Sequence, residues 1–338
     1  MTTRRNFLKN TTMLAAGLGV SPLLSSSPLR SYQKEEVING KVRIAVIGVG
    51  MGCRDLQGAL TDNPWVHCVG MCDVNKVRLE EQLARFKKDF PEQTVSIKAY
   101  TDFREVLANK EIDGVIIATP DHWHPYIFAE ALKAGKAIYV EKPVGNSISE
   151  CNAMMDFQKK YKGVVTTGLW QTSQRYFRAA NEILKSGVLG DVYKVQLWLC
   201  QSTNPRPSVE DSEAPSTLDY DMWLGPAPER PFNNSRFRGW RGFWDYGGGQ
   251  QTDWGVHWID SAFDGLKALG LCDREYPDAV FSIAYKDPAS FNETPSCQTS
   301  IFQYKNFHIE WAQQVAYLYN RNQGAVSYTH LRAHETLS

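Results

Sequence analysis

Between residues 41 and 143, short apolar runs alternate with amphipathic stretches of helical period. The apolar runs are nearly continuous, which is typical of parallel strands that are covered on both faces. The amphipathic stretches end at glycine or polar residues, as helices do. We expect strands at 41–47, 65–72, 95–99, 112–118 and 137–140, and helices at 76–86, 101–107 and 126–134. This alternation predicts an α/β domain built on a doubly wound parallel sheet.

The pattern changes beyond residue 143. A long amphipathic helix is expected at 147–161, and a second helix ends near Lys185. Residues 191–199 alternate between apolar and polar positions, which predicts an antiparallel strand with one covered face. Further strands are expected at 164–167, 280–285, 297–304 and 307–311. A second α/β domain of sheet and helices is therefore expected to begin near residue 144.

The charge balance and the cysteines argue against several classes of function. The 338 residues include 37 Lys and Arg and 37 Asp and Glu, so the formal net charge is zero and a nucleic-acid partner is not expected. No uncharged apolar run reaches about 18 residues, so no membrane span is expected. The seven cysteines include no C-x-x-C pair, so neither a zinc knuckle nor a redox pair is indicated.

The N-terminal segment has the features of an export signal. Arg4 and Arg5 precede a modest apolar stretch at 13–20, and Ser/Pro-rich sequence follows. Together these features predict a twin-arginine (Tat) signal over residues 1–30. The Tat translocon would then be a partner, and the location would be periplasmic or otherwise exported. The alternative is a disordered basic tail.

The stretch AVIGVGMGC, in which Cys53 replaces the third glycine of G-x-G-x-x-G, links the first expected strand to a helix. Gly48 permits the tight turn, Gly50 lets the backbone approach a pyrophosphate, and Met51 is counted with them as cofactor-binding. Asp73 ends the next strand, 73 − 48 = 25 residues on, where an acid accepts hydrogen bonds from ribose hydroxyls and repels a 2′-phosphate. We therefore expect NAD rather than NADP. The alternatives are a plain tight turn and an aspartate that only caps the following helix.

Two further loops follow expected strands of the same sheet. Thr119 and Pro120 open the loop TPDHWH after the fourth strand, and Glu141 and Lys142 open the loop EKP after the fifth. Ligands of open α/β sheets bind outside the carboxyl ends of the strands, so we expect both loops to face one crevice. A lysine there can hydrogen-bond a substrate hydroxyl and lower its pKa, although a solvated surface lysine is the alternative. We also expect a cis peptide bond before Pro143.

The stretch YGGGQQTDWGVHWID holds a second set of polar residues. Asp253 and His257 are four residues apart, so on a helix they share one face, and a histidine beside a carboxylate can act as a general base. A buried histidine that bonds the aspartate for structural reasons is an equally acceptable interpretation. His122, His124, Asp253 and His257 are also metal-ligand types, but their spacing does not support a metal site and no metal is expected.

Taken together, the segments VIGVGMG, CDVN, ATPDHWH, VEKPV, MWLGPAPERPF and YGGGQQTDWGVHWID resemble the Gfo/Idh/MocA family of oxidoreductases over about residues 41–324. The resemblance implies a Rossmann NAD-binding domain at 41–143 and an α/β domain at 144–324, whose open-faced, mostly antiparallel sheet often mediates homo-oligomers. It also implies a catalytic Lys142, with Asp253 as its acidic partner and His257 as proton acceptor and donor. His124 would line the nicotinamide side.

These features predict an exported NAD-dependent oxidoreductase that transfers hydride between a sugar or polyol hydroxyl and tightly bound nicotinamide. Two alternatives stay open. One is a glycosidase that oxidises the sugar, eliminates its substituent and returns the hydride on the same scaffold; the other is a non-catalytic carbohydrate-binding protein. The expected ligands are small-molecule sugars or glycosides. Residues 325–338 show no sheet or helix pattern, and we expect a non-native tail there and a truncated second sheet.

Overall fold

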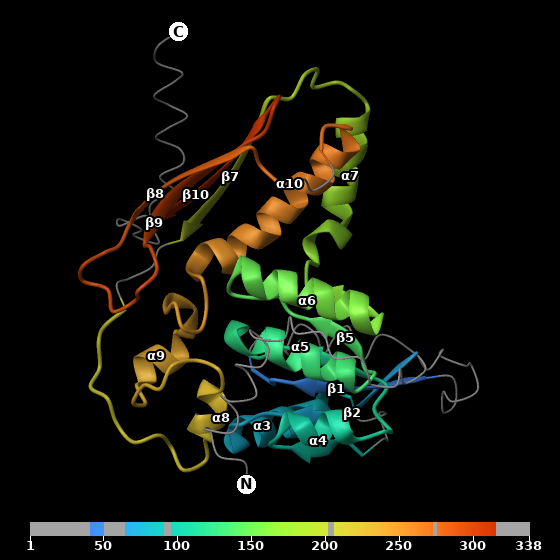
Figure 1. The fold of residues 1–338 in the computed structure, drawn as a ribbon, viewed down its shortest axis with the longest axis vertical. Helices are drawn as coiled ribbons and strands as arrows, with labels where there is room; N and C mark the ends of the chain where they lie inside the picture. The colour runs from blue at the N-terminus through green and yellow to red at the C-terminus, as the bar shows by residue number, and fades with distance from the viewer. Residues whose placement is uncertain (1–40, 51–64, 91–95, 202–205, 273–275, 316–338) are drawn as a thin grey trace, which may run out of the picture. The chain divides into compact units, whose positions relative to one another are not determined.

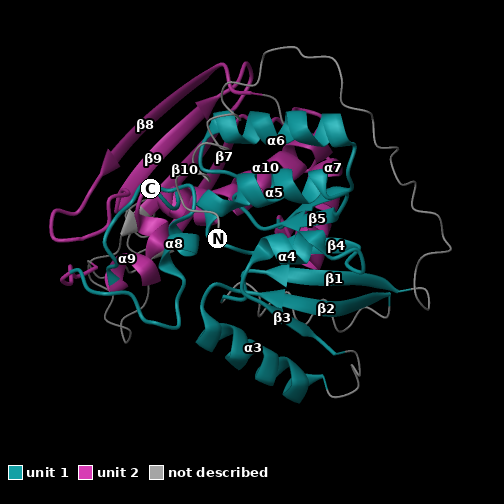
Figure 2. Cartoon of the chain, turned by 60° about the horizontal axis from the view of Figure 1, so that its bottom comes forward, with its two compact units in different colours: residues 1–168, 211–233, 245–247 teal, residues 169–210, 234–244, 248–338 magenta. Residues whose placement is uncertain are grey.

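The computed structural model describes residues 41–50, 65–90, 96–201, 206–272 and 276–315 (Figure 1). The described residues form two compact units, which are coloured separately in Figure 2. Unit 1 takes those up to Gly168 together with Asp211–Asn233 and Asp245–Gly247, and unit 2 takes Leu169–Glu210, Asn234–Trp244 and those from Gly248 onward. The predicted export signal at 1–30, the residues Met51 and Cys53, and the predicted tail at 325–338 lie outside the described residues.

Unit 1 is built on a six-stranded parallel sheet, which confirms the predicted doubly wound fold. The strand order is β3-β2-β1-β4-β5-β6. The strands are β1 Val42–Ile47, β2 Val66–Cys72, β3 Lys98–Tyr100, β4 Gly114–Ile117, β5 Ala137–Val140 and β6 Val165–Thr167. Because β6 pairs with β5, this sheet continues past residue 143.

Helices cover both faces of this sheet, as Figure 2 shows. The helices are α3 Lys76–Asp89, α4 Phe103–Ala108, α5 His124–Lys133 and α6 Ile148–Tyr161. Val115 and Ile117 of β4 pack in one apolar cluster with α4, α5 and α6, whereas Ile116 packs in a second cluster with α3. The nearly continuous apolar runs seen in the sequence therefore serve two cores at once.

Local signals set where two of these helices begin. The Oδ1 atom of Asn75 accepts the backbone N–H of Arg78 at 3.1 Å and caps α3. Ser147 and Glu150 form a capping box at α6, in which each side chain accepts the other residue's backbone N–H, at 3.2 and 3.1 Å. Each cap satisfies backbone donors that the first helical turn leaves without partners.

Unit 2 contains a four-stranded mixed sheet in the order β7-β10-β9-β8. The strands are β7 Lys194–Gln201, β8 Ala279–Tyr285, β9 Cys297–Gln303 and β10 His308–Val315. β9 is antiparallel to both of its neighbours, but β7 runs parallel to β10. The expected antiparallel direction of residues 191–199 is therefore wrong, because alternation reports a half-covered face and not the direction of the partner strand.

Helix α10, Val256–Ala268, packs on this sheet. Its Leu266 joins Phe307 and Ile309 in an apolar cluster, against which Val195 and Leu197 of β7 also pack. Helix α7, Arg175–Lys185, contacts α10 through a hydrogen bond of 2.5 Å from Asn181 Nδ2 to Asp264 Oδ2. No helix within the described ranges is both long and apolar enough to cross a membrane.

Candidate functional site

Gly48 forms the predicted tight turn directly after β1. Its φ angle is +88°, and its N–H donates to the carbonyl of Cys72 at 2.8 Å. A Cβ atom here would lie 2.6 Å from the carbonyl carbon and oxygen of Ala118, just after β4. Both the backbone angle and the lack of space require glycine at this position.

Gly50 lies in a more open environment. Among the described residues, a Cβ at this position would approach only Nη1 of Arg78, at 3.8 Å. The described residues therefore leave space beside this backbone for a close ligand, which fits the pyrophosphate of a dinucleotide. Its neighbour Met51 lies outside the described residues, so its predicted role stays a prediction.

Asp73 is only 7% exposed and holds the backbone of the turn in place. Its Oδ2 accepts the N–H of Val49 at 3.0 Å, and its Oδ1 accepts the N–H of Asn75 at 2.9 Å. Burial raises the pKa of this carboxyl, while the two backbone bonds and Arg78 oppose that shift. Since Asn75 caps α3, the capping alternative for Asp73 does not hold. A carboxylate has about four acceptor positions, so ribose hydroxyls can still bond to it.

Arg78 is a candidate cofactor residue that sequence reasoning missed. It lies in the first turn of α3, and its guanidinium reaches back towards Gly50 and Asp73. Side chains in a helix point towards its N-terminus, so a cation shortly after the acidic residue could have been noticed from spacing alone. The arrangement places a positive charge beside the turn that the cofactor's phosphates approach.

His124 joins the two strand-end loops of unit 1. Its ring is 1% exposed; Nε2 lies 2.9 Å from the carbonyl of Thr119, and Nδ1 lies 2.7 Å from the carbonyl of Pro143. A neutral imidazole can donate to one of these carbonyls, and an imidazolium donates to both. Pro120 follows Thr119 in the chain and immediately precedes the short helix η2, Asp121–Trp123. The predicted nicotinamide contact of His124 stays a prediction; the observed contacts fasten the loops together.

Glu141 and Lys142 lie immediately beyond β5. Glu141 accepts hydrogen bonds from Tyr139 Oη at 3.3 Å and from the backbone N–H of Lys142 at 3.2 Å. Burial and the adjacent carboxylate raise the pKa of Tyr139. The Lys142–Pro143 peptide bond is cis, as expected. Together with the contact of Gly48 against Ala118, these bonds bring the cofactor turn and both strand-end loops to one end of the sheet.

The segment 211–233 explains the rest of the TPDHWH loop. His122 Nε2 lies 3.0 Å from the carbonyl of Trp223, and Nε1 of Trp123 donates to the same carbonyl at 3.0 Å. Trp223 belongs to helix α8, Tyr220–Leu224. Burial lowers the pKa of His122 to about 4. Both side chains therefore pack for structure, and within the described ranges no group of three metal-ligand side chains forms.

In unit 2, Asp253 and His257 lie on either side of a change in helix type. Asp253 is in the π-helix η5, Gln251–Gly255, and His257 is in the first turn of α10. The two residues thus lie on one continuous helical stretch, as expected, but at Asp253 this stretch is π-helical, with hydrogen bonds that span five residues instead of four. His257 is 4% exposed and its ring lies 5.8 Å from that of Trp170.

Arg241 is the residue near Asp253 that sequence reasoning missed. Its Nε lies 3.1 Å from Asp253 Oδ1, an ion pair that lacks the alignment of a hydrogen bond. Its guanidinium also stacks 4.2 Å from the centre of the Trp240 ring. Arg241 comes from a different loop, the short helix η4, Trp240–Gly242, so no regular spacing could have linked it to Asp253.

The predicted site residues are thus divided between the units. Gly48, Asp73 and Lys142 are in unit 1, and Asp253 and His257 are in unit 2. Their joint action stays a prediction.

Two family descriptions match this chain. The NAD-binding Rossmann fold of the Gfo/Idh/MocA oxidoreductase family matches residues 42–169, and the C-terminal alpha/beta domain of that family matches residues 178–267. The chain belongs to this oxidoreductase family. The Rossmann match and the turn at Gly48 agree on NAD binding.

Among curated proteins, the chain is 33% identical over 163 residues to an alpha-N-acetylgalactosaminidase of Tannerella forsythia, covering 44% of this chain and 34% of that protein. It is 24% identical over 151 residues to inositol 2-dehydrogenase of Salmonella typhimurium, covering 44% and 43%. The chain thus spans less than half the length of these relatives. The WlbA dehydrogenase of Bordetella pertussis, solved with NADH and UDP-GlcNAcA, has a TM-score of 0.60 at 17% identity, covering 83% of this chain and 73% of that one, which shows a shared fold.

Proposed function

We propose that the chain is part of an exported NAD-dependent oxidoreductase that moves hydride between a sugar or polyol hydroxyl and tightly bound nicotinamide. The observation that carries this proposal is the meeting of the Gly48 turn with the loops of Thr119 and Lys142 at one end of the sheet in unit 1. Ligands of such sheets bind at that end.

The proposed roles follow from the chemistry of the side chains. When bound, NAD supplies the hydride acceptor. Lys142 donates a hydrogen bond to the substrate oxygen and stabilises the alkoxide as it forms. His257 accepts the hydroxyl proton, and Asp253 orients the charged groups around it.

A glycosidase that uses the same steps is the second candidate. It is favoured by the 33% identity to a protein named as an alpha-N-acetylgalactosaminidase, compared with 24% to an inositol dehydrogenase. Such an enzyme would oxidise the sugar, eliminate its substituent, add water in its place and return the hydride, so the net reaction is hydrolysis with no redox change.

The first test uses protein purified without added cofactor. Acid release should yield NAD, and one sugar of a panel should produce a lasting absorbance band of reduced nicotinamide. If a glycoside releases its aglycone without a lasting band, the glycosidase is the correct candidate. If neither reaction occurs and no NAD is released, the non-catalytic carbohydrate-binding protein is the remaining candidate.

His257→Ala should abolish turnover while leaving the amount of bound NAD unchanged. His308→Ala, which changes a half-buried histidine of β10 in the same unit, is the matched control and should retain turnover. Full activity of the His257 variant would contradict the proposed proton acceptor.

Export through the Tat translocon is a separate part of the proposal. Replacing Arg4 and Arg5 by lysine should keep the protein in the cytoplasm, as fractionation of cells would show. Unchanged export would refute the Tat route and leave the oxidoreductase proposal standing.

A further inference from the structure

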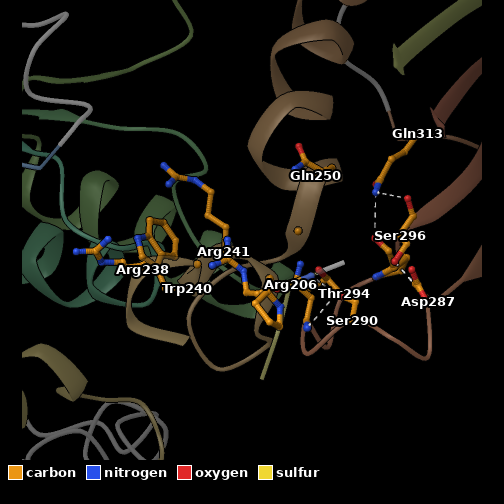
Figure 3. A pocket seen from close by; sticks show the side chains of 16 residues that line it. Arg206, Arg238, Trp240, Arg241, Gln250, Asp287, Ser290, Thr294, Ser296 and Gln313 are labelled. Atoms are coloured by element: carbon orange, nitrogen blue, oxygen red, sulfur yellow. Dashed lines mark hydrogen bonds between the residues drawn. The ribbon is translucent and has the colours of Figure 1, made fainter. Parts of the chain in front are cut away.

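Unit 2 contains a polar pocket of about 500 Å³, drawn in Figure 3. This volume lies within the roughly 300–1,000 Å³ of small-molecule sites. Most such sites are lined by apolar side chains, but this one is lined largely by arginine, hydroxyl and amide groups. Arg238, Trp240 and Arg241 gather on one side of the pocket, and Asp287, Ser296 and Gln313 on the other (Figure 3). A pocket of this composition suits a hydrophilic ligand.

The lining carries a surplus of positive charge. The described residues that line it include three arginines, Arg206, Arg238 and Arg241, but only one carboxylate, that of Asp287. Asp287 is buried and its Oδ1 accepts the backbone N–H of Ala289 at 2.9 Å, so it is engaged in its own turn. Arg206 bonds a neutral acceptor, the carbonyl of Ser235, at 3.3 Å. Because Arg241 is paired with Asp253, Arg206 and Arg238 supply the surplus.

The pocket adjoins one of the proposed catalytic residues within unit 2. Arg241 both lines the pocket and forms the ion pair with Asp253. Gln250, another lining residue, immediately precedes the π-helix that carries Asp253. A ligand held by these arginines would therefore lie beside Asp253.

We propose that this pocket binds the anionic group of an acidic carbohydrate, either a carboxylate or a sulfate ester. The planar fork of arginine bonds both groups with two parallel hydrogen bonds, and charged partners make such bonds stronger than neutral ones. The hydroxyl and amide side chains on the other side match the hydroxyls of the sugar ring. In taking the ligand as the substrate, this inference rests on the proposed function.

The test is calorimetric titration of the purified chain with glucuronate, glucose 6-sulfate, glucose and inorganic sulfate. The better of the two acidic sugars should bind about tenfold more tightly than glucose, and it identifies the anion. Arg238→Gln should weaken that binding about tenfold without changing glucose binding. Arg238 is exposed, so this variant should fold normally. Arg178→Gln removes the same charge from an exposed position on α7 of the same unit and should alter binding by less than about twofold.

Three binding results would each overturn the inference. Both acidic sugars could bind no more tightly than glucose, the Arg238 and Arg178 variants could behave alike, or inorganic sulfate could bind as tightly as the acidic sugars. Turnover of a neutral sugar by an NAD-loaded enzyme, with no acidic sugar bound, would refute this pocket assignment while the oxidoreductase proposal stands. If a protein that carries no NAD binds an acidic sugar tightly and this binding depends on Arg238, the pocket assignment stands and the oxidoreductase proposal is refuted.

Discussion

The turn after β1 in unit 1 and the π-helix before α10 in unit 2 both hold residues assigned to chemistry, but different interactions fix them. In the turn, the contacts involve the backbone: Gly48 lies so close to the carbonyl of Ala118 that no Cβ fits, and Asp73 accepts two backbone N–H groups. At the π-helix, a side chain from another loop, Arg241, pairs with Asp253. The first arrangement tolerates few substitutions, while the second depends on two side chains that can be exchanged separately.

The sharpest way to break this comparison is Gly48→Ala. The positive φ angle and the collision with Ala118 should lower the free energy of unfolding by about 3 kcal/mol or more. Gly50→Ala is the matched control, with an expected change of about 0.5 kcal/mol, since among the described residues its Cβ would meet only Nη1 of Arg78, at an ordinary contact distance of 3.8 Å. Chemical denaturation measures both, and equal losses would contradict the account of the turn.

The Gly50 variant has a second use, because its new methyl group would stand where the cofactor's phosphates approach. It should bind NAD more weakly while it unfolds at nearly the same denaturant concentration as the parent. Unchanged NAD affinity would show that the cofactor does not approach Gly50.

The strand-end loops of unit 1 should also give the protein a characteristic pH dependence. The pKa of His122 is lowered to about 4 in the folded state, against about 6.5 in the unfolded chain. As pH falls from 6.5 to 4, only the unfolded chain gains this proton, so up to about 3 kcal/mol of stability should be lost. Asp73, whose pKa is raised, acts in the opposite direction, because its protonation stabilises the folded state as pH falls.

His122→Gln isolates this contribution, since its amide extends about as far as Nε2 and can donate to the carbonyl of Trp223. Unfolding curves at several pH values should show a shallower loss on the acid side than in the parent. If both proteins lose stability in parallel between pH 6.5 and 4, His122 is not the group responsible.

Arg241→Gln tests the side-chain pairing of unit 2. It should reduce turnover about tenfold, because Asp253 loses the cation that holds it. The matched control is Arg230→Gln in unit 1, where Arg230 and Asp245 pair at 2.6 Å with similar exposure. Both variants should lose about 1 kcal/mol of stability, and only the first should lose activity. Equal turnover of the two variants would show that the ion pair with Arg241 does not support the proposed role of Asp253.

The smallest expected effect is a difference in NAD affinity between variants of two helix caps. Asn75→Ala and Ser147→Ala should each cost about 1 kcal/mol in unfolding free energy. Asn75→Ala should also weaken NAD binding, because the start of α3 positions the backbone N–H that Asp73 accepts. Equal NAD affinity in the two variants would show that the cap does not reach the cofactor.

Sequence predicted unit 1 well because its signals are local. Apolar runs, a glycine turn and a strand-end aspartate each lie within one short segment, and all are found where expected. The reach of Arg78 towards Gly50 was missed, although it also depends on local spacing.

Unit 2 resisted prediction for physical reasons. The parallel direction of β7 depends on its pairing with β10, more than a hundred residues later, and alternation carries no trace of it. The π-helix is indistinguishable from an α-helix by spacing over so few residues, and the pairing of Arg241 with Asp253 joins two loops. The same limit hid the arginine pocket, whose lining comes from five separate stretches of chain.

The return of residues 211–233 to unit 1 has a consequence for how the protein is made. When the ribosome completes β6 at Thr167, the carbonyl of Trp223 is still 223 − 167 = 56 residues away. Until that segment emerges, the nascent chain must carry the ring of Trp123 and the imidazole of His122 without the cover they have in the folded state. Synthesis of unit 2 therefore begins before unit 1 is complete, and the indole N–H of Trp123 waits for its acceptor until helix α8 has been made.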